Sequence, residues 1–157
     1  MRTTIITTEV ETCTEHRLLD YRGKCAHLHG HNYRWVMRLG TLVQDEKYGI
    51  GVDFGHVKEH LKRYTDPFDH SMVLREDDPA IPFLKETGQR LVVLNANPTA
   101  ENLSTLLATV LTELYLNSWV NIELWETSKC RVDGNGADGS EVRIVELCNT
   151  EVPLGLV

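Results

Sequence analysis

The stretch CAHLHGHNY, residues 25–33, places one thiol and three imidazole rings within seven positions. Thiol and imidazole donors at this density suggest a transition metal, zinc first among them. Alternate side chains of an extended segment point to the same face, so His27, His29 and His31 would share one face of a strand. Two of them could bind one ion, and a third ligand would come from elsewhere, because a catalytic zinc usually has three protein ligands. The structural alternative is a polar strand edge beside an inert, buried Cys25.

Length and composition indicate an ordinary globular chain. Its 157 residues predict one domain spanning 1–157, and 41% hydrophobic with 25% charged residues is typical of soluble proteins. The formal charge of -7 argues against a nucleic-acid partner, which needs basic patches. No apolar run indicates a signal peptide or a membrane span, and the four cysteines form no C-x-x-C pair. We therefore expect a cytoplasmic protein with reduced thiols.

The hydrophobic periodicity predicts an α+β fold. Strands are expected at 3–14, 33–43, 119–127 and 141–148, and helices at 56–64 and from Thr99 to about 114. Residues 75–98 contain three prolines and predict an irregular excursion with one brief strand or helix at 91–94, and the glycine-rich segment 133–140 predicts a loop. This order favours a four-stranded antiparallel sheet with two main helices on one face. Such a sheet has unpaired edges, which assembly into a ring of subunits would remove.

Further polar residues stand at the ends of these elements. Asp69-His70 is an adjacent carboxylate and imidazole, although a turn would explain it. Thr99 and Glu101 lie where helix capping and the helix dipole alone could account for them. Glu126 ends the apolar face of the 119–127 strand, so it either reaches water or holds a partner there, because burying an unpaired carboxylate is costly.

An ordered set of motifs over residues 5–147 resembles the 6-pyruvoyltetrahydropterin synthase superfamily. The set comprises His16-Arg17, Cys25-x-x-x-His29-Gly30-His31-Asn32, Asp53-Phe54, Asp69-His70, Pro98-Thr99-Ala100-Glu101-Asn102 and Glu126-Thr127. The resemblance implies a tunnelling fold, in which subunits join their sheets into a barrel and place active sites at their interfaces. It further implies a homo-oligomer, which we expect to be a hexamer.

The resemblance also implies roles for single residues. One zinc ion per subunit would be held by His16, His29 and His31, leaving His27 as a non-ligand. The catalytic group would comprise Cys25 as the thiol, Asp69 and His70 as a proton relay, and Glu126 as the anchor of the pterin. Thr99 and Glu101 would be further substrate contacts, and Arg17, Arg22 and Lys24 are candidates for binding phosphate.

The three-residue gap between Cys25 and His29 resembles the carboxy-forming branch of the family. That branch converts 7,8-dihydroneopterin triphosphate to 6-carboxytetrahydropterin, acetaldehyde and triphosphate in 7-deazaguanine (queuosine-type) biosynthesis. Alternatives are the pyruvoyl-forming lyase reaction on the same substrate and a non-catalytic zinc- or pterin-binding protein. Glu15 departs from the family pattern beside the first ligand, where it would change the charge of the pocket or, as alternation from an inward His16 predicts, point outward.

Overall fold

The fold is built on a long antiparallel pair of strands, β1 (Thr4–His16) and β2 (His29–Thr41). The computed structural model describes residues 4–41, 47–116, 118–136, 140–153 and 155–156. The two strands pair without a break from Thr4↔Thr41 to His16↔His29. The alternation predicted for β2 is confirmed: its buried face carries Tyr33, Trp35, Met37 and Leu39.

Among the described residues, seven strands form one mixed sheet in the order β6-β5-β2-β1-β3-β4-β7. The strands not yet introduced are β3 (Ser71–Arg75), β4 (Leu91–Leu94), β5 (Ser118–Thr127), β6 (Cys130–Asn135) and β7 (Ile144–Cys148). β3 runs parallel to β1 and to β4, whereas the other pairs are antiparallel.

The prediction of a four-stranded antiparallel sheet is therefore wrong. β3 and β4 are too short to show alternation, and all four residues of β4 are buried. Parallel strands covered on both faces read as uniform apolar runs, so their sequence resembles a buried turn or helix segment. The predicted loop at 133–140 begins as β6, which pairs with β5 as a hairpin. The predicted 141–148 strand is shorter, and β7 pairs with β4.

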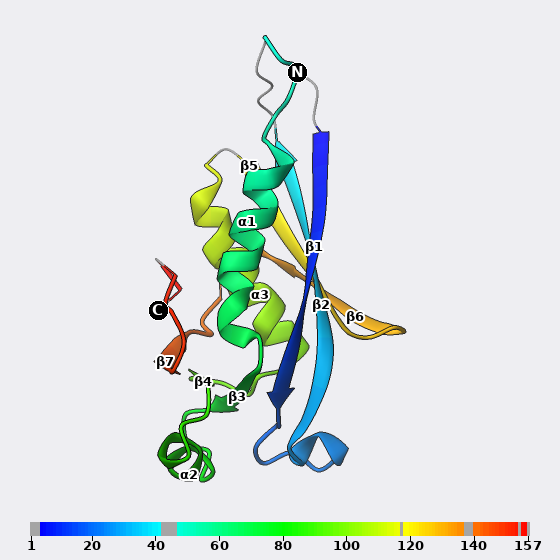
Figure 1. Ribbon diagram of the computed structural model, residues 1–157. Coiled ribbons are helices and arrows are strands. Elements are labelled where there is room, and N and C mark those ends of the chain that lie inside the picture. The colour runs from blue at the N-terminus through cyan, green and yellow to red at the C-terminus, as the bar shows by residue number, and fades with distance from the viewer. Residues whose placement is uncertain (1–3, 42–46, 117, 137–139, 154, 157) are drawn as a thin grey trace.

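Two main helices cover one face of the sheet, as predicted (Figure 1). α1 (Phe54–Thr65) begins after Asp53, whose side chain accepts a hydrogen bond from the Gly55 amide. α3 (Ala100–Leu114) begins after Thr99, whose hydroxyl accepts from the Asn102 amide. The short helix α2 (Ile81–Glu86) lies between β3 and β4. The 3-10 turn η1 (Lys24–Ala26) lies between β1 and β2, and η2 (Asp66–Phe68) lies between α1 and β3.

The main core lies between the sheet and these two helices. The apolar stripe of α3 faces β5 and β6, and α1 packs on β1. This cluster includes Trp35, Met37, Leu61, Leu103, Leu107, Leu111 and Ile122. A smaller apolar cluster lies between α2 and β4. Within the described ranges, no helix combines the length and apolar character needed to cross a bilayer.

Candidate functional site

Three histidines meet where β1 ends and β2 begins. The strand register pairs His16 with His29 and Thr14 with His31, so all three rings lie on the face that the helices cover. Each histidine offers one ring nitrogen within 4.8 Å of the others, and the ring centroids are 4.5 to 5.2 Å apart. The structure thus brings together the three residues that the resemblance suggested as ligands.

Hydrogen bonds fix the orientation of two of these rings. The Nδ1 atom of His16 lies 2.8 Å from the carbonyl oxygen of Pro98, and that of His29 lies 2.7 Å from the carbonyl oxygen of His27. A carbonyl only accepts, so each Nδ1 carries the proton and each Nε2 keeps its lone pair. Backbone acceptors of this kind are the usual outer partners of histidine metal ligands.

The third ring also fits a metal. The Nε2 atom of His31 is buried and has no hydrogen-bond partner among the described residues, a costly arrangement unless the atom has a ligand. Burial lowers the pKa of His16 and of His31, and both rings are therefore neutral near pH 7. A set of three imidazoles matches the ligands of a catalytic zinc. His27 is exposed and precedes β2, so the expectation that it shares the strand face is wrong.

Glu126 closes this cluster from the end of β5. Its Oε1 atom lies 3.4 Å from His31 Nε2 and 3.5 Å from His16 Nε2, and its side chain is 31% exposed. The hydroxyl of Tyr33 donates to the same oxygen at 3.2 Å. Burial, and then the charge of Glu126, raise the pKa of Tyr33, which keeps this donor protonated. Tyr33 is not among the site residues that the sequence predicts, although it continues the two-residue period of His29 and His31.

A cavity of about 340 Å³ adjoins the histidines. Its lining includes His16, Cys25, Thr99, Glu101 and Glu126. These side chains come from the end of β1, from η1, from the start of α3 and from the end of β5. A thiol, two carboxylates and a hydroxyl thus face one space beside the three-histidine cluster, which suits proton transfer and hydrogen bonding to a polar small molecule.

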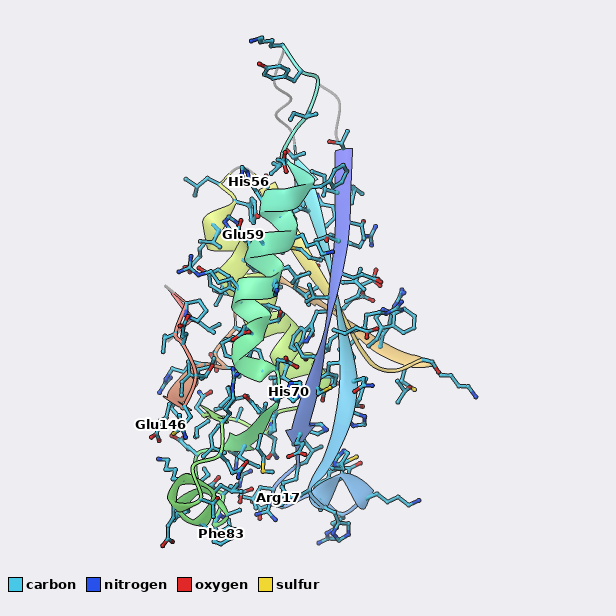
Figure 2. All side chains as sticks on the ribbon, viewed as in Figure 1. Arg17, His56, Glu59, His70, Phe83 and Glu146 are labelled. Carbon is cyan, nitrogen blue, oxygen red and sulfur yellow. The ribbon has the colours of Figure 1, made fainter. Side chains whose placement is uncertain are left out.

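Asp69 and His70 do not line that cavity. Asp69 Oδ2 lies 3.0 Å from His70 Nδ1, and Asp69 Oδ1 accepts a hydrogen bond from the Cys13 amide at 2.9 Å. The His70 amide donates to the Cys13 carbonyl at 2.7 Å. Cys13 alternates with the buried Thr12 and Thr14, so the pair stands on the sheet face opposite the histidines. Figure 2 shows His70 beside the arrowhead end of β1.

The cationic candidates differ in their surroundings. Arg17 makes a two-pronged contact with Asp78, in which Arg17 Nε lies 2.6 Å from Asp78 Oδ2 and Nη2 contacts Oδ1. Arg17 therefore forms an ion pair within the fold, at the end of the molecule that carries α2 (Figure 2). Arg22 and Lys24 are exposed, and Glu15 is exposed on the outer face as expected.

Comparison with known proteins gives one consistent family. The 6-pyruvoyl tetrahydropterin synthase family model matches residues 5–137. A 6-carboxy-5,6,7,8-tetrahydropterin synthase of Rickettsia felis is 36% identical over 134 residues, covering 81% of this chain and 96% of that protein. The enzyme of the same name from Aquifex aeolicus is 30% identical over 125 residues, covering 70% of this chain and 75% of that one.

Solved structures support the same fold. An uncharacterized protein from Wolinella succinogenes superposes with a TM-score of 0.71 at 23% identity, covering 86% of this chain and 99% of its own. The 6-pyruvoyl tetrahydropterin synthase of Plasmodium vivax superposes with a TM-score of 0.66 at 15% identity, covering 92% and 100%. At these identities the likeness concerns the fold alone.

Proposed function

The chain belongs to the 6-pyruvoyl tetrahydropterin synthase family, and from this premise we propose that it is a zinc-dependent synthase of the carboxy-forming branch. The proposed reaction converts 7,8-dihydroneopterin triphosphate to 6-carboxytetrahydropterin, acetaldehyde and triphosphate, for 7-deazaguanine biosynthesis. Two relatives that bear the corresponding name, at 36% and 30% identity, support this branch. The observation that carries the proposal is the three-histidine cluster beside a cavity that Cys25 and Glu126 line.

His16, His29 and His31 would hold the zinc ion through their Nε2 atoms. When bound, the ion supplies Lewis acidity, which makes a substrate hydroxyl easier to deprotonate. Cys25 would act as the general base that moves protons along the substrate side chain. Glu126 would accept hydrogen bonds from the N–H and amino edge of the pterin, and the Tyr33 hydroxyl would hold that carboxylate in place. Thr99 and Glu101 line the same cavity and would add polar contacts to the ring.

Asp69 and His70 would serve a cavity other than that of their own chain. Asp69 holds His70 Nδ1 at 3.0 Å, which leaves Nε2 to transfer a proton, in the way a carboxylate orients a catalytic imidazole. Because this pair does not line the cavity of Cys25, we propose that subunits assemble, as a hexamer, with each active site shared across an interface. Among the described strands, β6 and β7 lie at the two edges of the sheet, and pairing of such edges between subunits would favour this assembly.

The first experiment incubates the purified, zinc-loaded protein with 7,8-dihydroneopterin triphosphate and identifies products by mass spectrometry. Acetaldehyde with 6-carboxytetrahydropterin is the expected result. A pyruvoyl product would move the chain to the other branch, and no product from zinc-replete protein would favour a binding role. The Cys25→Ala variant should keep zinc and lose turnover, whereas His31→Ala should lose zinc. An equal loss of zinc in both variants would make Cys25 a ligand and overturn its role as base.

Complementation tests the shared site. Cys25→Ala and His70→Ala should each be inactive alone. If each site takes its thiol and its imidazole from different subunits, random mixing of the two variants restores about one quarter of the sites. Activity that stays at the level of the separate variants would show that both groups act within one chain.

A further inference from the structure

A second set of metal-binding groups lies on the outer face of the sheet, around Cys13. The Cys13 thiol, a ring nitrogen of His70 and a carboxylate oxygen of Asp69 all lie within 4.8 Å of one another. Across the strand pair, Asn32 Oδ1 lies 3.4 Å from Cys13 Sγ. Three side chains from neighbouring segments thus lie next to one another: Asn32 of β2, Cys13 of β1 and His70, which comes just before β3.

The spacing of these donors suits a tetrahedral ion. Bond lengths of about 2.0 to 2.3 Å to nitrogen, oxygen and sulfur imply donor-to-donor distances of roughly 3.3 to 3.8 Å. The Cys13–Asn32 separation falls in that range, and the Asp69–His70 separation of 3.0 Å is slightly below it. The separations of the Cys13 thiol from the Asp69 and His70 donors, at most 4.8 Å, would close through rotation of these side chains.

The backbone holds these groups in place before any ion arrives. The Cys13 amide binds the Asp69 carboxylate, and the Cys13 carbonyl binds the His70 amide. His70 adopts a left-handed conformation with φ of 50°, which is unfavourable for a residue with a side chain. These contacts keep a side chain that is 73% exposed next to the thiol. In the single subunit this site is open to solvent, so an ion could reach it directly.

We propose that Cys13, Asp69 and His70, with Asn32 as a weaker oxygen donor, form a second site for a thiophilic divalent cation such as zinc. This site is distinct from the three-histidine cluster, because it stands on the opposite face of the sheet and contains a cysteine sulfur. An ion bound here would occupy His70, so zinc above one equivalent would inhibit proton transfer. That last consequence alone rests on the proposed function.

Cobalt titration of the metal-free full chain distinguishes the two sites. A thiolate ligand gives Co²⁺ a charge-transfer absorption in the near-ultraviolet, which histidine ligands alone do not give. We expect the wild type to bind a second equivalent of Co²⁺ and to show this band. Cys13→Ser and His70→Ala should lose the band and the second equivalent, and Cys25→Ser should keep both. Cys13→Ser retains the backbone contacts to Asp69, so it should fold as the wild type does.

The experiment distinguishes a failure of the second metal site from a failure of the proposed function. A single equivalent in the wild type, or a band that disappears with Cys25→Ser and persists in Cys13→Ser, would overturn the second site. Where the chain is active, excess zinc should inhibit the wild type and spare Cys13→Ser, whose activity at one equivalent of zinc should be unchanged. If the chain proves inactive on pterins, the cobalt result still decides whether the second site exists.

Discussion

Replacing Arg17 by methionine should destabilise the fold without specifically weakening substrate binding. Arg17 contacts both carboxylate oxygens of Asp78, whose side chain is only 1% exposed, while Arg17 itself is 21% exposed. Burial, the largest single influence, raises the pKa of Asp78, but the Arg17 hydrogen bonds, the Ala80 amide and the Arg17 charge together hold the pKa below its usual value. The Arg17→Met variant would therefore leave a buried carboxylate without its cation.

Removing one partner of a buried ion pair costs about 3 to 5 kcal/mol. We expect the lower end, about 3 kcal/mol, because Asp78 keeps its hydrogen bond from the Ala80 amide at 2.9 Å. For a chain of this size each kcal/mol lowers the melting temperature by about 2 to 4 °C, so Tm should fall by roughly 6 to 12 °C. Denaturant unfolding and thermal melting measure both quantities.

The matched control is Arg22→Met, since Arg22 is an exposed arginine of the same loop. Its unfolding free energy should stay within about 0.5 kcal/mol of the wild type. The double variant Arg17→Met with Asp78→Leu should recover part of the loss, because the unpaired charge is gone. An Arg17→Met protein as stable as the Arg22→Met control, with a raised KM for the triphosphate substrate, would refute the structural role.

Three further changes have defined outcomes. Gly134→Ala would press its new Cβ onto the backbone of Ser104 and Thr105 in α3 and should cost about 1 to 3 kcal/mol in denaturant unfolding; unchanged stability would contradict this close packing. Burial raises the pKa of Tyr115 from 10 to about 12. The protonated side chain therefore makes its full contribution to the free energy of unfolding below pH 10, and that contribution is lost as the pH rises toward 12. Tyr115→Phe should flatten that alkaline decline in unfolding free energy. Zinc at one hundred times its Kd should add about 2.7 kcal/mol to unfolding, and His31→Ala should abolish the gain.

Long periodic segments made much of the fold predictable. The alternation of β2 and the helical stripe of α3 each extend over enough residues to distinguish a strand from a helix. β3 could not be found in this way, and for β4 the sequence indicated only a brief strand or helix at 91–94, because both strands are short and their contacts depend on residues distant in the chain. The glycines of β6 suggested a turn, although Gly134 is required there for close approach to α3.

The candidate site was predictable to a similar extent. A two-residue period places His29 and His31 on one face, but only the register of β1 against β2 brings His16 to them. The cluster around Cys13 had no sequence signal. Its partner Asp69 lies 56 residues away, and the contact depends on the pairing of β1 with β3 that periodicity did not reveal.

Because β1 pairs with β2 without a break, the number of residues in β1 determines which of its side chains face the three-histidine cluster. Thr14 and His16 point inward, while Cys13 and Glu15, which alternate with them, point outward. Deleting one residue between Thr7 and Thr12 would shift every later side chain of β1 to the other face if the start of the strand stayed in register. The deletion would turn His16 to the solvent and carry the Cys13 thiol toward the imidazoles. We therefore expect insertions and deletions inside this strand pair to destroy the site.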